Sequence, residues 1–167
     1  MAKHVLYIRM EKYLRQWVVH QYGEEPVSFP RWSKENDFLQ DHVQRKPWYW
    51  KPEPSEDSLS ISVPKREGFQ RRTWCYVPAY KLVILRKMLQ EKFYRAFFGY
   101  IATPNPNIKT MKGRIIAFMN ANGIEEDKSN LETLMKIRQR KKHLYEIPAD
   151  IDMKANKSHK GTRKKTK

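Results

Sequence analysis

Apolar residues recur along this chain with two different spacings, and each spacing predicts its own kind of element. Residues 5–10 form an apolar run with β-branched and aromatic members, which predicts a short strand or the first turn of the following helix. Leu59, Ile61 and Val63 alternate with serines, and this period of two predicts a strand with one buried face. Residues 74–77 predict a further strand, which we expect to pair with that one as a hairpin across a basic loop.

Helical spacing marks the segments between these strands. Residues 11–22 predict a helix, and Gly23 follows it at the place of a left-handed C-terminal cap. Residues 34–45 predict a second helix with Ser33 as its N-cap, and Pro47 is expected to end it. Each boundary depends on a residue type that favours helix ends.

The longest predicted helix covers residues 78–98. Its apolar stripe is typical of a core-facing helix and consists of Leu82, Leu85, Leu89, Phe93 and Phe97. Gly99 is expected to end the helix. Pro104 and Pro106 stiffen residues 100–108, which we interpret as a linker.

Two further helices are predicted beyond the linker. The first covers residues 109–122, and Asn122 with Gly123 forms its C-terminal signal. The second covers residues 130–146 and begins with a Ser-x-x-Glu capping box, in which Ser129 is the N-cap and Glu132 reaches back to it. An acidic triplet lies between the helices, so residues 109–147 resemble a helix–turn–helix pair.

A helical wheel of residues 130–146 separates a predicted buried arc from a polar face. The buried arc comprises Leu131, Leu134, Met135, Ile137, Leu144 and Tyr145. Lys136, Gln139, Arg140 and His143 lie on the opposite face, and these residue types contact phosphates and base edges in a major groove. The alternative is a packing helix with an ordinary solvated face, and the acidic triplet would be unfavourable against a DNA backbone.

Together these elements predict an α+β, mainly helical fold with short N-terminal strands or a hairpin, several helices and a C-terminal helix–turn–helix-like pair. Residues 1–99 are expected to form a mixed helical and β-hairpin core, and residues 100–108 a proline-rich linker. Residues 109–147 would hold the helix pair, and residues 148–167 a disordered basic tail.

Charge adds a class of partner to this picture. The chain of 167 residues has 34 Lys plus Arg against 18 Asp plus Glu, a formal net charge of +16. Such a surplus attracts phosphate polymers, although it also keeps a protein in solution. Hydrophobic residues make up 40% of the chain, enough for a core, and no stretch approaches the roughly 18 to 20 apolar residues of a membrane span. We therefore expect a nucleic-acid partner and no membrane partner.

Further cations extend the candidate interface. Lys112 and Arg114 lie on the outer face of helix 109–122. The tail would hold phosphates without sequence preference, or would only be a solubilising end. Its candidate contacts are Lys160, Arg163, Lys164 and Lys165.

Aromatic residues beside cations form a second candidate feature. Trp32, Trp48, Trp50 and Trp74 all lie in short segments with Lys or Arg neighbours. Such rings stack on unpaired bases while the cations bind phosphates, or else they pack on a small core. Because Trp48 and Trp50 alternate, one is expected to face inward and the other outward.

No grouping in the sequence predicts catalysis. The chain lacks a Gly-rich phosphate loop, a nucleophile elbow and a His-Glu-x-x-His helix, and its five histidines do not have ligand spacing. Cys75 is the single cysteine, which excludes a disulfide scaffold, and we interpret it as a small buried hydrophobe. We expect no catalytic residue, metal, cofactor or enzymatic activity, although a nuclease built from carboxylates close in space would be invisible in a sequence.

Two parts of the chain carry a recognisable set of residues. The first comprises Tyr7, Ile8, Arg9, Met10, Leu14, Trp17, His20, Gly23, Pro26, Val27, Phe29, Pro30, Ser33, Glu35 and Asn36. The second comprises Phe118, Met119, Asn122, Gly123, Ile124, Glu132, Thr133 and Leu134, with the basic run after it. Together they resemble a group of small uncharacterised basic proteins encoded in prophage-like and other mobile elements of Bacteroides-type bacteria. The resemblance implies a bacterial mobile-element setting in which small basic proteins often handle DNA, and it carries over no catalytic residue. We expect a cytoplasmic protein, because the sequence shows neither a membrane span nor a signal peptide.

The sequence thus favours a non-enzymatic DNA-binding accessory or regulatory protein of a mobile element, with helix 130–146 facing a groove and the tail holding the backbone. DNA is preferred over RNA as the partner. One alternative is a structural or protein-interaction module, including a homodimer, with incidental charge. Another is a binder of single-stranded nucleic acid or RNA that uses the exposed tryptophans.

Overall fold

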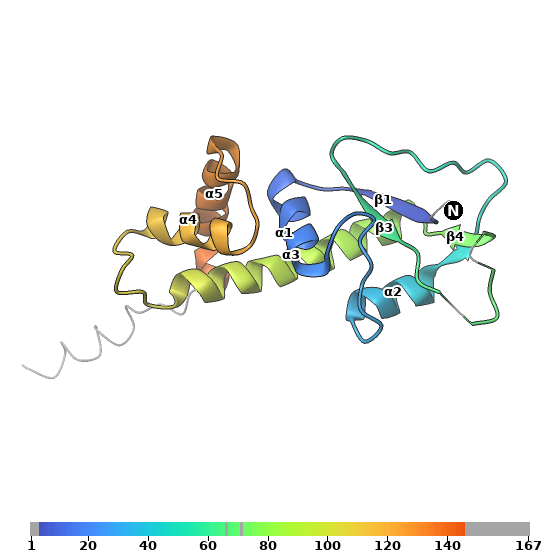
Figure 1. Ribbon diagram of the computed structural model, residues 1–167, viewed down its shortest axis with the longest axis horizontal. Coiled ribbons are helices and arrows are strands. Elements are labelled where there is room, and N and C mark those ends of the chain that lie inside the picture. The colour runs from blue at the N-terminus through green and yellow to red at the C-terminus, as the bar shows by residue number, and fades with distance from the viewer. Residues whose placement is uncertain (1–3, 66, 71, 146–167) are drawn as a thin grey trace, which may run out of the picture.

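The computed structural model describes residues 4–65, 67–70 and 72–145. This part of the chain has an α+β fold in which helices dominate, as predicted. Helix α3 (Ala79–Ala102) runs along most of the molecule (Figure 1). No helix among the described residues combines the length and the apolar character needed to cross a lipid bilayer.

The other helices are divided between the two ends of α3 (Figure 1). Helix α2 (Lys34–His42) lies with the strands at one end, and α4 (Met111–Ala121) and α5 (Lys128–Tyr145) lie at the other. Helix α1 (Lys12–Tyr22) lies between the two groups. The predicted pair of C-terminal helices is therefore a distinct feature of the structure.

The larger sheet pairs two strands that are far apart in the sequence. β1 (Val5–Arg9) and β3 (Ser58–Ser62) are antiparallel, with Leu6 opposite Ile61 and Ile8 opposite Leu59 on the buried face. The predicted hairpin between β3 and the strand that follows it in sequence is therefore wrong. The physical reason is that β1 offers five paired positions with a matching apolar face, whereas the later strand has three residues.

That later strand, β4 (Trp74–Tyr76), pairs instead with the two-residue strand β2 (Gln44–Arg45). Helix α2 consequently ends at His42, three residues before the predicted end. Val43 is extended and buried, so the chain leaves the helix to place this side chain in the core and to pair with β4. The beginning of α2 is as predicted.

Helix α3 continues through Gly99, where the sequence predicted its end. Gly99 has no neighbour that a β-carbon would meet, while Ile101 two residues later is fully buried. The hydroxyl of Thr103 donates to the Gly99 carbonyl at 2.9 Å and closes the last turn. Burial of one more apolar residue therefore outweighs the cost of a helical glycine, and residues 100–102 of the predicted linker are helical.

Phe93 connects the apolar residues of both ends. Its ring lies 5.0 Å from Tyr13, 5.5 Å from Trp17 and 5.8 Å from Phe118 of α4. The buried side chains before and after the predicted linker belong to one cluster. The division into separate units at residues 1–99 and 109–147 stays a prediction.

Glu25 links α1 to β3 inside this framework. Arg15 donates to one carboxylate oxygen at 2.6 Å, and the amide and hydroxyl of Ser60 donate to the other at 3.0 and 2.6 Å. Burial raises the pKa of Glu25, but these hydrogen bonds outweigh it and hold the pKa below the ordinary value of 4.5. The ionised carboxylate thus holds the helix against the sheet.

Candidate nucleic-acid interface

The turn between α4 and α5 is built by a local C-terminal signal. Gly123 has a φ of 64°, and the amide of Ile124 donates to the Met119 carbonyl at 2.9 Å. Ile124 is buried, as expected for the apolar residue of such a turn. This confirms the end predicted for the first C-terminal helix and fixes where the chain enters the second.

Helix α5 begins earlier than predicted, and a different residue caps it. Asp127 accepts a hydrogen bond from the amide of Asn130 at 2.6 Å, three residues on. Ser129 lies inside the helix, and Glu132 is 3.9 Å from Lys128 instead of reaching back to a serine cap. The predicted capping box is wrong because an ionised carboxylate two residues earlier accepts from the same turn, where the helix dipole favours negative charge.

The predicted polar face of α5 is open to solvent. Lys136, Gln139, Arg140 and His143 are all exposed, and none of them makes a hydrogen bond or ion pair with another described residue. The sequence of residues 136–143 holds five Lys or Arg and no acidic residue. Two of these cations, Lys136 and Arg140, therefore present positive charge that the described part of the fold does not use.

The buried face of α5 is smaller than the buried arc that the helical wheel predicts. Leu134 is fully buried, but Met135 is 44% exposed and Leu144 64% exposed. Both lie at the edges of the arc, where no other element covers them. The apolar contact of α5 is thus narrower than predicted.

The last turn of α5 is anchored on α3. Tyr145 stacks on Phe98 with a centroid separation of 4.8 Å, and its hydroxyl donates to Glu91 at 2.6 Å. Burial and this carboxylate raise the pKa of Tyr145 to about 12. Lys141 places its ammonium 4.8 Å from the centre of the Tyr94 ring. These contacts hold the exposed face in a fixed orientation.

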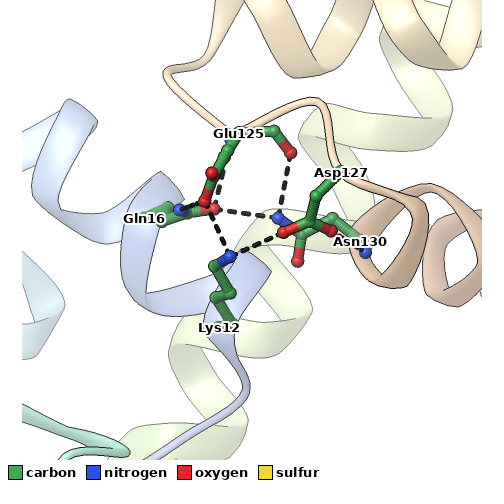
Figure 2. Close-up of polar contacts among 5 residues, drawn as sticks. All are labelled: Lys12, Gln16, Glu125, Asp127 and Asn130. Atoms are coloured by element: carbon green, nitrogen blue, oxygen red, sulfur yellow. Dashed lines mark hydrogen bonds and ion pairs between the residues drawn. The ribbon is translucent and has the colours of Figure 1, made fainter.

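Two acids of the triplet, Glu125 and Asp127, point toward Lys12 of α1 (Figure 2). Lys12 lies 2.7 Å from the carboxylate of Glu125 and 2.6 Å from that of Asp127. The two carboxylates raise the pKa of Lys12, and Lys12 lowers the pKa of Glu125. The pKa of Asp127 is lowered first by the amide of Asn130 and then by Lys12. One ammonium therefore offsets part of the charge of two of the three acids and directs both toward α1, which weakens the objection that the triplet would oppose DNA.

Asn130 joins the same contact from the buried side (Figure 2). Its side-chain amide donates to the Gln16 oxygen at 3.1 Å and to the Glu125 carbonyl at 3.0 Å. Gln16 also accepts from the Glu125 amide at 3.2 Å. Sequence reasoning missed this contact, because its two sides lie more than 100 positions apart and neither side carries a local motif.

The cations predicted on α4 differ in their surroundings. Lys112 is exposed and has no partner among the described residues. Arg114 is partly buried and donates to the Ile101 carbonyl near the end of α3 at 3.1 Å, which ties its guanidinium to the fold. The predicted tail contacts lie outside the described residues: Lys160, Arg163, Lys164 and Lys165.

The four candidate tryptophans divide into two pairs. Trp32 is 87% exposed and Trp48 is 94% exposed. Trp50 packs edge-to-face on Tyr76, and Trp74 packs on Phe69, so both rings cover the core. The expected alternation of Trp48 and Trp50 is confirmed.

The described residues do not bring any three His, Cys, Asp or Glu side chains together as a metal site. Burial raises the pKa of the Cys75 thiol, which disfavours the thiolate needed for nucleophilic chemistry. Comparison of the chain with family models, with curated proteins and with solved structures gave no match. The proposals below therefore depend on the geometry and charge of this molecule.

Proposed function

We propose that this protein binds double-stranded DNA without enzymatic activity, with the exposed face of α5 in the major groove. The observation that carries the proposal is that Lys136, Gln139, Arg140 and His143 project from one face of an anchored helix with no partner among the described residues. Lysine and arginine recognise guanine and glutamine recognises adenine in the major groove, and all of these residues contact phosphates.

The shape of the helix supports this mode. α5 has 18 residues, which makes it about 27 Å long at about 1.5 Å per residue. A single α-helix fits the roughly 12 Å width of the major groove. The four side chains follow a spacing of three and four residues, so they face the same way over two turns of helix.

The setting in a mobile element is part of the proposal and is supported by the resemblance of both ends of the chain to small basic prophage proteins. In such a setting the protein would act as a regulator or accessory factor, and the basic tail would add phosphate contacts without sequence preference. Arg114 contributes to this function by fixing α4 on α3, and Lys112 remains available for phosphate.

The test compares two variants for binding to short duplexes over a salt series. The combined change Lys136→Ala, Gln139→Ala and Arg140→Ala removes exposed side chains, so circular dichroism should be unchanged. If both cations contact phosphates, loss of two such contacts should reduce the slope of log affinity against log salt by about 1.8. The control Arg31→Ala with Lys34→Ala removes the same charge from exposed positions at the other end of the molecule.

The proposal predicts weaker duplex binding for the α5 variant and little change for the control. Equal losses in both variants would show that the charge acts without a defined interface and would contradict it. Absence of duplex binding by the unaltered protein at physiological salt would also contradict it. The protein-interaction alternative would then have an exposed apolar surface on α3, formed by Tyr80, Val83 and Ile84.

A further inference from the structure

The small sheet of β2 and β4 brings two cationic segments together. Arg45 pairs with Trp74 across the sheet, and the Lys46 amide donates to the Thr73 carbonyl at 2.7 Å. The loop after β2 therefore lies beside the turn that precedes β4. We call this region the ribbon surface and define it by the exposed residues Arg45, Lys46, Trp48, Tyr49, Lys51 and Arg72.

Two aromatic rings of the ribbon surface project into solvent. Trp48 is 94% exposed and Tyr49 is 69% exposed, and their rings meet edge-to-face at 5.7 Å. Trp50 follows directly and packs on the core, so the exposed pair is attached to a fixed part of the fold. Large rings whose faces are left in water are typical of sites that stack on a ligand.

The two segments that form this surface carry charge of one sign. The sequences of residues 44–51 and 69–76 contain five Lys or Arg and no acidic residue. Arg45, Lys46, Lys51 and Arg72 are exposed, and none of them forms a salt bridge with another described residue. A partner of this surface should therefore combine negative charge with flat rings.

We propose that the ribbon surface is a second binding site, which takes single-stranded DNA by stacking bases on Trp48 and Tyr49 and binding phosphates with the surrounding cations. Bases within a duplex are stacked on each other and offer no free face to these rings, whereas unpaired bases do. The site goes beyond the proposed duplex function, because it uses other residues at the opposite end of α3. That helix has 24 residues and is about 36 Å long, so the two sites are separate surfaces.

The main test measures fluorescence anisotropy of a labelled single-stranded 12-mer of mixed sequence at 150 mM salt. Trp48→Ala with Tyr49→Ala should lower its affinity at least tenfold, because each base–aromatic stack typically contributes more than a fivefold gain. The control Trp32→Ala removes a ring of similar exposure, located before α2 and away from the ribbon surface, and should leave the affinity within about twofold. All three changes are at the surface, and thermal melts should confirm that the fold is intact.

The cations are tested separately. Arg45→Gln with Lys51→Gln should reduce the slope of log affinity against log salt by about 1.4, since each phosphate contact contributes about 0.7 on single strands. An unchanged slope would contradict a phosphate role for this surface.

Crossed measurements distinguish this site from the α5 interface. The α5 variant Lys136→Ala, Gln139→Ala and Arg140→Ala should keep its affinity for the single strand, and the Trp48→Ala, Tyr49→Ala variant should keep its affinity for the duplex. Loss of both activities in the α5 variant would place single strands on α5 and overturn the inference while leaving the duplex proposal standing. Failure of the unaltered protein to bind the 12-mer, or a tenfold preference for the RNA of the same sequence, would also overturn it.

Discussion

Replacing Asn130 with alanine tests how α5 is held against the N-terminal half of the molecule. The side chain is only 2% exposed, and its amide group makes two hydrogen bonds, to the Gln16 oxygen and to the Glu125 carbonyl. Alanine removes both hydrogen bonds. Water cannot take the place of the lost amide group unless the contact opens. We therefore expect a measurable loss of stability from a single polar contact.

The magnitude follows from what each partner loses. Both acceptors keep another donor, because the Glu125 amide still bonds Gln16 and the Asp127 amide donates to the Glu125 carbonyl at 2.9 Å. The cost is therefore the loss of two hydrogen bonds, each of which contributes about 0.5–1.5 kcal/mol. Alanine regains about 0.5 kcal/mol as a better helix former. The free energy of unfolding should therefore fall by about 1–2 kcal/mol, whereas the neighbouring ion pairs of Lys12 are exposed to solvent and should contribute much less.

Urea denaturation followed by circular dichroism measures this difference. Asn120→Ala is the matched control, because Asn120 is exposed on α4 and makes no side-chain contact with another described residue. It should leave the free energy of unfolding within about 0.5 kcal/mol of the unaltered protein. The loss in Asn130→Ala should persist at high salt, since screening weakens ion pairs and not this amide. Equal unfolding midpoints for the two variants would refute the reasoning.

Two further predictions concern backbone conformation and pH. Gly123→Ala should destabilise the protein by at least about 1 kcal/mol, because the position has a positive φ of 64° and an added β-carbon would come within 2.7 Å of the His20 ring. Gly99→Ala should instead stabilise the protein by about 0.5–1 kcal/mol, because Gly99 is helical and nothing lies near its β-carbon position. Thermal melts of the two variants test whether the melting temperature falls in the first and rises in the second. The depressed pKa of Glu25 contributes stability that is present above its ordinary value of 4.5 and is lost as pH falls through the folded value. Urea midpoints between pH 7 and pH 3 should therefore fall less steeply for Glu25→Gln, and parallel curves would contradict the assignment.

Local signals predicted helix ends well where the deciding atoms lie within one turn. Gly23 has a φ of 98° and follows α1, and the Ser33 hydroxyl accepts from the Asn36 amide at 3.1 Å. Gly123 and Ile124 form the expected turn after α4. In each case the residue type and its immediate neighbours determine the conformation, so the end of the helix can be predicted from the sequence.

Errors arose where distant packing decided between two local possibilities. The partner of β3 depends on how well β1 matches it, although some fifty residues separate them. The end of α3 depends on a pocket for Ile101 and not on Gly99 itself. Which apolar residues are buried in the core depends on tertiary packing, which cannot be predicted from local patterns in one sequence.

The candidate site shows the same division. The exposed face of α5 follows from helical periodicity, and the structure places all four predicted side chains in solvent. The orientation of the acidic turn does not follow from any pattern, because its partners Lys12 and Gln16 lie in α1. Helix periodicity says which residues share a face, whereas only tertiary contacts say what that face meets.

The distribution of charge around α5 supports the proposed interface with DNA. Lys136 and Arg140 are like charges four residues apart, an arrangement that costs a few tenths of a kcal/mol in an isolated helix. The helix dipole partly offsets repulsion in the last turn, and Lys141 is held over the Tyr94 ring. No carboxylate of the described residues pairs with Lys136 or Arg140, and Glu132, one turn before Lys136, lies 3.9 Å from Lys128 instead. A phosphate backbone would supply the missing negative charge, and any ligand that binds only the folded state raises its stability. Binding of DNA and stability of α5 are therefore expected to rise together in the unaltered protein, and this coupling should weaken when these two cations are removed.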